Sequence, residues 1–231
     1  MDIFICKLLL ALFSMYIFDI ISVYIHPFIC KKHLVNKHVS ESERWFFIHI
    51  INNIFIINAC YFEIVRCVKN LYICDTQPIY NSTQNAFIIA KASHIYHLLF
   101  FKNNSYDILL HHIVMCVFCG PIVYIFSNTA MAASMMFFLS GLPGFLDYIN
   151  LYLVKLGYLS SKHQKIIYLY ISLILRCPGI LFFSIAQMLY NNGETTSEYI
   201  MRNILGLITM WNSQYFLYLT IKDVIKKNVL A

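Results

Sequence analysis

Long apolar stretches, separated by short loops that hold most of the charges, constrain the fold of this chain more than any other feature. Charged residues make up 12% of the chain and hydrophobic residues 60%, whereas soluble domains contain about 25% charged and about 45–50% apolar residues. The sequence therefore predicts an all-α integral membrane protein. Its 231 residues leave room for one membrane domain and no separate soluble domain.

Seven stretches are long enough for transmembrane helices, because about 20 apolar residues cross a bilayer as a helix. The fifth is interrupted by Gly141-Leu-Pro-Gly144. This interruption predicts either a kinked span or a partly re-entrant segment, since freed backbone groups need partners at that depth. The expected spans are Ile3–Tyr24, Trp45–Val65, Ala86–Phe101, Ile108–Phe126, Ala130–Val154, Ile166–Tyr190 and Ile200–Ile221.

The basic residues of the loops lie unevenly on the two sides of the membrane. Eleven Lys and Arg fall in loops on one side, and only Arg66, Lys69 and Arg202 fall on the other. Cytosolic loops carry the excess of basic residues, so we expect a cytosolic C-terminus and, with seven spans, a lumenal or external N-terminus. The sequon that begins at Asn81 then predicts glycosylation, whereas the one at Asn103 is cytosolic and should stay unmodified.

Two adjacent histidines, His111 and His112, stand at the head of the fourth expected span. Ionisable side chains at membrane depth are costly and usually face a cavity or a partner, so they indicate a functional site. Asp107 precedes His111 by one helical turn, where a carboxylate would fix the imidazole tautomer and raise its basicity for acid–base catalysis. We therefore predict these three residues to be catalytic.

Polar side chains on other expected spans point to the same interior. The third span carries three of them at i, i+3 and i+6, on one helix face, and the fifth carries Asp147. This pattern predicts a bundle of helices around a polar cavity, with Asp147 as a fourth catalytic residue. Interhelical hydrogen bonds, or a buried ion pair between Asp147 and Arg176, are the structural alternatives. The residues expected to contact the substrate are Lys91, His94, His97, Asn150 and Arg176.

The order and spacing of several short segments carry a resemblance to a known family. They are Arg44-Trp45 with His49, then Ser93-His-Ile-Tyr-His97, the basic Lys102, Leu109-Leu-His111-His112, and Gly141 to Asp147 with Lys155 after it. This pattern resembles the TLC domain, the membrane domain shared by ceramide synthases, translocating-chain-associated membrane proteins and related lipid-handling proteins. The resemblance covers roughly residues 40–227.

The resemblance implies a TLC-like domain at 40–227, preceded by a first transmembrane helix and basic cytosolic loop at 1–39 and followed by a cytosolic tail at 228–231. It implies the endoplasmic reticulum as the compartment and membrane lipids as ligands. The implied activity is an acyltransferase with acyl-CoA as co-substrate and no other cofactor. His111 or His112 would act as general base or carry the acyl group, and Asp147 would help to position an amine.

Other functions remain open at this stage. Ceramide synthases carry a His-Asp-x-x-Asp motif where this chain has Pro143-Gly-Phe-Leu-Asp147, so a non-catalytic lipid-binding or membrane-composition protein is the alternative. A His-rich metal enzyme is disfavoured because the remaining histidines are scattered, and we expect no metal site. The basic residues sit in short loops and do not indicate nucleic-acid binding. The resemblance leaves a homodimer open.

Overall fold

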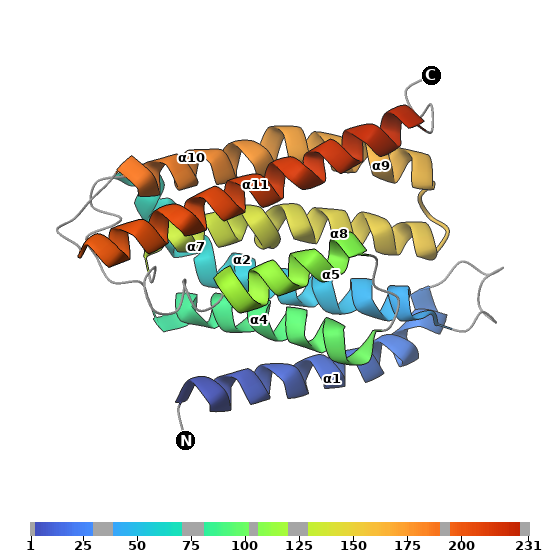
Figure 1. Cartoon of the computed structure of the whole chain (residues 1–231). Helices are drawn as coiled ribbons and strands as arrows, with labels where there is room; N and C mark the ends of the chain where they lie inside the picture. Colours follow the sequence, from blue (N-terminus) through green and yellow to red (C-terminus); the bar gives the residue numbers. More distant parts are fainter. Residues whose placement is uncertain are drawn as a thin grey trace.

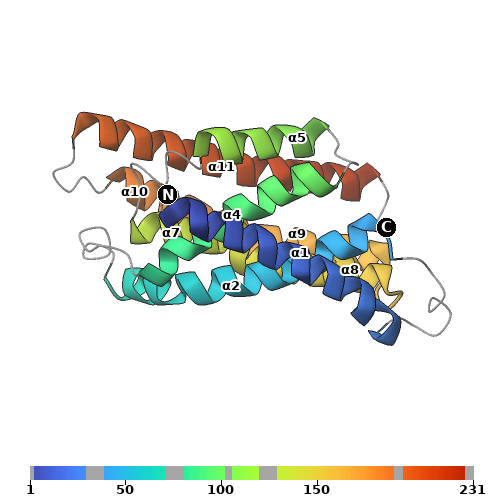
Figure 2. The ribbon, with the colours of Figure 1, turned by 90° about the horizontal axis from the view of Figure 1, so that it is seen from below.

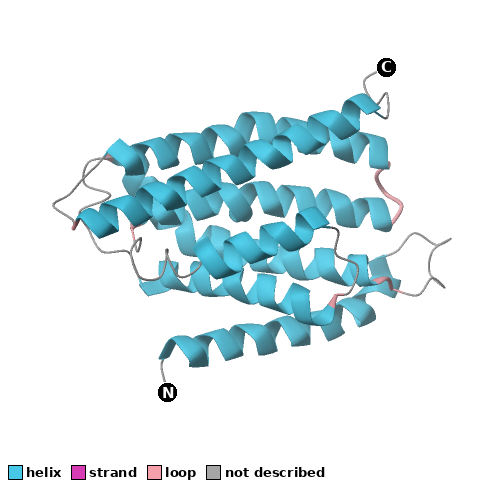
Figure 3. Ribbon diagram, viewed as in Figure 1, coloured by secondary structure: helices cyan, strands magenta, loops and turns pink. Residues whose placement is uncertain are grey.

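The computed structural model describes residues 3–29, 39–70, 81–101, 106–119, 129–189 and 195–226. Within these ranges every regular element is helical (Figure 3), which confirms the all-α prediction. Helices satisfy their backbone hydrogen bonds internally, as an apolar surrounding requires. The α-helices are α1 (Ile3–Ile29), α2 (Glu41–Lys69), α4 (Asn81–Phe100), α5 (Tyr106–Ile113), α7 (Ala130–Met136), α8 (Leu142–Lys155), α9 (Ser161–Ile171), α10 (Cys177–Leu189) and α11 (Thr196–Lys226), and the π-helical segments are η2 (Val114–Cys119), η3 (Phe137–Gly141) and η4 (Ser172–Arg176).

Four helices of the described residues are long and apolar enough to cross a membrane. They are α1, α2, the continuous helix Ala130–Lys155 and the continuous helix Ser161–Leu189. This finding supports an integral membrane protein. The other three expected spans fall outside this set, because α4 and α11 carry more polar residues and the described part of α5 with η2 is short.

The helices lie lengthwise beside one another (Figure 1). α2 packs against α1, α4, α7 and α8, whereas α11 packs mainly against α10 and α9. Seen from below, α5 and α11 lie together on the side of the bundle away from α2 (Figure 2). α1 begins and α11 ends at opposite ends of the bundle (Figure 1).

The outer helix α1 is apolar toward the surroundings and polar toward the bundle. Its apolar side chains are exposed, for example Phe13 at 60% and Phe28 at 89%. Its buried residues Met15, Asp19, Ser22 and His26 recur on one face. Such a contiguous apolar outer surface is what lipid tails would cover.

Two π-helical segments precede the prolines of the long spans. η3 ends at Gly141, just before Pro143, and η4 ends at Arg176, just before Pro178. Proline lacks an N–H group and its ring crowds the preceding turn, and the wider π turn absorbs this disturbance without breaking the helix. The segment around Gly141 therefore belongs to a continuous helix that runs from Ala130 to Lys155 and is long and apolar enough to cross a membrane.

An ion pair joins the first three helices. Arg44 of α2 donates from its Nε to Asp19 Oδ1 of α1 at 2.6 Å and from a terminal nitrogen to Oδ2 at 2.5 Å. Tyr96 of α4 donates its hydroxyl to Asp19 Oδ2 at 2.9 Å. The Asp19 side chain is 5% exposed, so these contacts compensate a carboxylate that is otherwise buried among apolar residues. No local pattern in the sequence indicated this role for Asp19.

Replacing Asp19 with Ala should destabilise the protein by about 1–3 kcal/mol, because the buried hydroxyl of Tyr96 loses its acceptor and the partly exposed Arg44 loses its carboxylate. The measurement is the thermal unfolding of the detergent-solubilised protein, followed by size-exclusion chromatography. Tyr24→Ala is the matched control, since Tyr24 lies on the same helix and is 70% exposed. Equal stability of the two variants would contradict the role of Asp19.

Gly179 allows α10 to approach η3 closely. A Cβ atom at this position would lie 2.3 Å from the ring of Phe138. We expect Gly179→Ala to lower the free energy of unfolding by about 1–3 kcal/mol, as overpacking does in other cores. Gly141→Ala is the control, because its Cβ would meet side chains only at 3.4 Å or more. The same thermal assay checks the pair, and a tolerated Gly179→Ala would show that the ring moves aside.

Candidate functional site

One cavity of about 610 Å³ lies inside the bundle. It extends from Ser40, Glu41 and Ser42 at the start of α2 to Asn212 and Phe216 on α11. Ser40 caps α2 in a reciprocal arrangement with Glu43, which fixes where the helix begins beside the cavity. The π-helical segments η2, η3 and η4 also contribute residues to the cavity wall. π turns often occur at functional sites.

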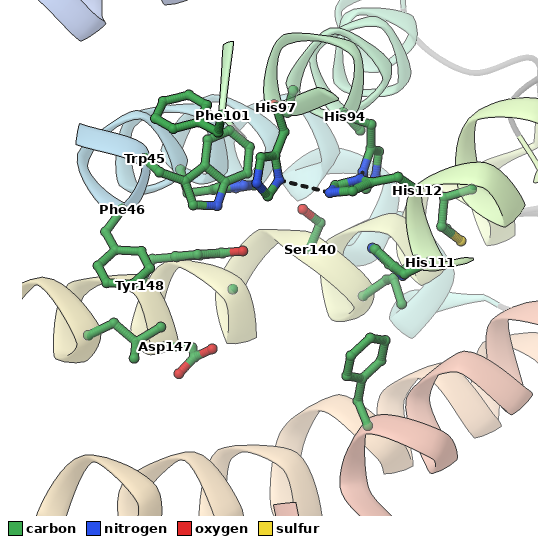
Figure 4. Close-up of a pocket in the computed structure, with 18 of the residues that line it drawn as sticks. Trp45, Phe46, His94, His97, Phe101, His111, His112, Ser140, Asp147 and Tyr148 are labelled. Atoms are coloured by element: carbon green, nitrogen blue, oxygen red, sulfur yellow. Dashed lines mark hydrogen bonds between the residues drawn. The ribbon is translucent and has the colours of Figure 1, made fainter. Parts of the chain in front are cut away.

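Four histidines of α4 and α5 meet on one wall of this cavity (Figure 4). His94 and His97 lie one turn apart on α4, and His111 and His112 are neighbours on α5. The ring centroids of His94 and His112 are 4.8 Å apart, and those of His97 and His112 are 4.6 Å apart. The structure thus brings together the two histidine groups that the sequence indicated separately.

His112 links the other histidines through both of its ring nitrogens. Its Nδ1 lies 2.6 Å from Nδ1 of His94, and its Nε2 lies 2.8 Å from Nδ1 of His97. In each contact one nitrogen must carry the hydrogen and the other must accept it. His112 is also buried, with 4% of its surface exposed. Both nitrogens of His112 are therefore engaged.

His111 differs from His112 because only one of its ring nitrogens has a hydrogen-bond partner, and that partner lies on another helix. Nδ1 of His111 lies 2.9 Å from Oδ1 of Asn212 on α11. The amide oxygen can only accept, so Nδ1 carries the hydrogen and Nε2 keeps its lone pair. A partner that fixes the tautomer in this way prepares an imidazole to act as a base or a ligand.

Asn212 orients His111 in the structure, whereas the orienting role that the sequence assigned to Asp107 stays a prediction. The side chain of Asp107 lies outside the described side chains, as does that of Asn81. Asn212 is 101 positions beyond His111 in the chain, so no local spacing could connect them. The only signal was a polar residue within an otherwise apolar stretch.

Aromatic side chains form the wall beside His97. The ring of Trp45 lies 4.0 Å from that of His97 and 3.8 Å from that of His49, between centroids. Tyr148 stacks on His49 at 4.0 Å with the rings nearly parallel. This wall, visible in Figure 4, holds the histidine rings in place. Tyr148 was missed in the sequence, although it directly follows Asp147.

Asp147 and Arg176 both line the cavity but do not form the ion pair that was the structural alternative. Asp147 Oδ1 accepts a hydrogen bond from Gln164 at 3.0 Å. Arg176 donates to the hydroxyl of Tyr168 at 2.7 Å, and its Nε is buried without a partner. The two groups thus remain separate polar features of the cavity wall.

Two of the residues expected to contact a substrate lie away from this cavity. Lys91 lines a smaller neighbouring cavity of about 60 Å³, and its ammonium group lies 5.3 Å from the ring centre of Phe4. Asn150 donates to the backbone oxygen of Leu146 at 2.6 Å, a local helix contact. In contrast, His94, His97 and Arg176 all line the main cavity.

Three of the histidines could hold a metal ion, although the sequence predicted no metal site. One ring nitrogen from each of His94, His111 and His112 lies within 4.8 Å of the corresponding nitrogen of the other two. Scattered histidines weighed against a metal in the sequence, because the spacing of desaturase-like clusters is absent. Tertiary contacts in the fold bring together histidines whose spacing in the sequence did not indicate a metal site.

In its described residues the chain is thus an all-helical protein with four helices long and apolar enough to cross a membrane and a cavity lined by histidines. Comparison of the chain with protein-family models, with curated proteins and with solved structures finds no match. The resemblance to the TLC domain therefore stays a prediction from the sequence.

Proposed function

We propose that the chain is a lipid-metabolism protein with a TLC-like bundle of seven transmembrane helices around a polar cavity. Four of its helices are long and apolar enough to cross a membrane. α4, α5 with η2, and α11 carry the four clustered histidines and Asn212, which accounts for their greater polarity. Polar groups in membrane helices are expected to face such an interior.

A lipid with an acyl or sphingoid chain is the ligand that fits this cavity best. Its volume of about 610 Å³ lies within the range of about 300–1,000 Å³ that is common for small-molecule sites. Trp45, Phe46 and Phe101 offer apolar contact for a chain, and the histidines offer hydrogen bonds for a carbonyl or amine. An amphiphile needs both the apolar contacts and the hydrogen bonds.

The reaction that we propose is transfer of an acyl group from acyl-CoA to a lipid amine. The observation that carries this proposal is the free lone pair of His111, whose other nitrogen is held by Asn212. This lone pair would either take the proton of the attacking amine, or attack the thioester, expel the thiolate and pass the acyl group on. His112 suits this role less well, because both of its nitrogens are engaged.

A non-catalytic lipid-binding protein is the second candidate. Asp147, the residue expected to position the amine, accepts a hydrogen bond from Gln164. Three of the four clustered histidines bond to one another. Histidines that satisfy one another's hydrogen bonds also suit a cavity that only stores or senses a lipid. These buried polar groups then need no substrate as a hydrogen-bond partner.

The first test compares His111→Ala with wild type in amide formation from long-chain acyl-CoA and a sphingoid base, measured by lipid mass spectrometry. Loss of a positioned acid–base group should reduce turnover about 10²–10⁴-fold. Asn212→Ala should reduce it less, since the imidazole remains without its partner. His163→Ala, on an exposed histidine of α9, is the control.

Co-purified lipid without any product in the wild type would favour the lipid-binding candidate. Full turnover in His111→Ala would exclude the proposed role of His111. Co-purified lipid that is retained in both variants would support the cavity as the lipid site, whereas only turnover decides the role of His111.

We further propose that the protein resides in the endoplasmic reticulum with a lumenal N-terminus and a cytosolic C-terminus. This topology puts the C-terminal end of α2 and the start of α4 on the lumenal side. Cys67, near the end of α2, is disulfide-bonded, and disulfides form in oxidising compartments such as the lumen. That bond supports the orientation independently of the basic loops.

Asn81→Gln should remove the only expected glycan when the protein is made in the presence of eukaryotic microsomes, because only the sequon at Asn81 faces the lumen in this topology. The measurement is the loss of the glycosidase-sensitive mobility shift on a gel. Asn103→Gln is the matched control and should leave the shift unchanged. A shift that depends on Asn103 would invert the proposed orientation.

A further inference from the structure

We propose that His94, His111 and His112 bind one divalent transition-metal ion, and that zinc is the ion they fit best. The inference goes beyond the proposed function and does not depend on it. Three imidazoles from two helices converge here, with their ligand nitrogens within 4.8 Å of one another. Figure 4 shows these rings facing the same region of the cavity.

The hydrogen bonds around the cluster assign the nitrogen that each ring would offer. Metal-binding histidines usually donate their second N–H to a neighbouring acceptor, which orients the ring. Asn212 accepts from Nδ1 of His111 and leaves Nε2 for the ion. His97 contacts Nε2 of His112 and leaves Nδ1 for the ion. Two of the three ligands therefore already have the outer partner that a metal site needs.

The contact between His94 and His112 indicates that His94 would offer its Nδ1 as the remaining ligand nitrogen. Their Nδ1 atoms lie 2.6 Å apart and share one hydrogen. For both Nδ1 atoms to bind the ion, that hydrogen would move to Nε2 of His94, which leaves all three imidazoles neutral. With Zn–N bonds of about 2.0–2.1 Å, tetrahedral geometry separates the ligand nitrogens by about 3.3 Å. The two Nδ1 atoms of this pair must move apart by about 0.7 Å while His111 moves closer, which side-chain rotations can provide.

The ligand type selects the class of ion. Imidazole suits zinc, copper, iron and nickel, whereas magnesium and calcium prefer oxygen ligands. A set of three histidines with a fourth position left open is an arrangement that zinc adopts in proteins. Here the fourth position faces the cavity. Because three neutral imidazoles leave the charge of the ion uncompensated, an anionic oxygen such as hydroxide or a lipid carboxylate is favoured there.

The site has a consequence for the proposed acyl transfer. One lone pair of His111 cannot hold a metal ion and accept a proton or an acyl group at the same time. Bound zinc should therefore inhibit acyl transfer that runs through a free His111. Removal of the metal by a chelator should restore it.

The decisive experiment titrates zinc into the metal-free, full-length protein in detergent, purified without a polyhistidine tag, with the stoichiometry read by elemental mass spectrometry and the affinity by calorimetry. We expect about one zinc per chain in the wild type. His94→Ala, His111→Ala and His112→Ala should each abolish stoichiometric binding. His97→Ala and Asn212→Ala should weaken it about 10–100-fold, as losing an outer partner does.

His163→Ala is the matched control, because His163 is exposed on α9 and lies outside both the cavity and the set. It should bind zinc with unchanged stoichiometry. Cobalt absorption in the wild type provides a second readout that needs no variant, since tetrahedral nitrogen ligation gives an intense visible spectrum. An absence of stoichiometric zinc and of this spectrum in the wild type would overturn the proposal. Unchanged zinc binding in a variant that combines His94→Ala, His111→Ala and His112→Ala would overturn it as well.

The outcomes separate this inference from the proposed function. Acyl transfer by metal-free protein that binds no zinc would remove the metal site and leave the enzyme. Stoichiometric zinc in a protein that shows no acyl transfer even after a chelator has removed the metal would support the site and remove the proposed reaction.

Discussion

The structure depends on one constraint: polar side chains on apolar helices must find their partners within the bundle. A lipid-facing surface offers no hydrogen bonds, so each buried polar group is costly unless another helix satisfies it. α1 illustrates this, because its exposed face is apolar while Asp19 turns inward to Arg44 and Tyr96. The same requirement draws α4, α5 and α11 together through their histidines and Asn212.

The two chemical uses that we propose for the histidine cluster rest on one geometric observation. Asn212 fixes the tautomer of His111 and leaves a lone pair pointing to a cavity with room for a lipid. That lone pair can act as a base toward an amine or as a ligand toward a metal ion, but it cannot do both at once. Chemistry and metal binding are therefore linked through a single nitrogen.

Much of the helical architecture could be read from the sequence, because apolar runs of this length have few other solutions in lipid. The stripe of His94 and His97 and the pair His111 and His112 were also predictable, since residues at i and i+3 share a helix face. Asn212 was not, because its partner is distant in the chain. Lys91 shares the face of His94 by spacing but turns to a neighbouring cavity.

The sequence by itself determined that the chain is helical, that it carries membrane-crossing segments and which helix faces are polar, because these properties follow from local composition and a fixed helical period. Only the tertiary structure decided which polar faces meet. It separated His111, with one free nitrogen, from His112, which has none. Relations of this kind depend on how helices pack against one another, and no local spacing in the chain contains that information.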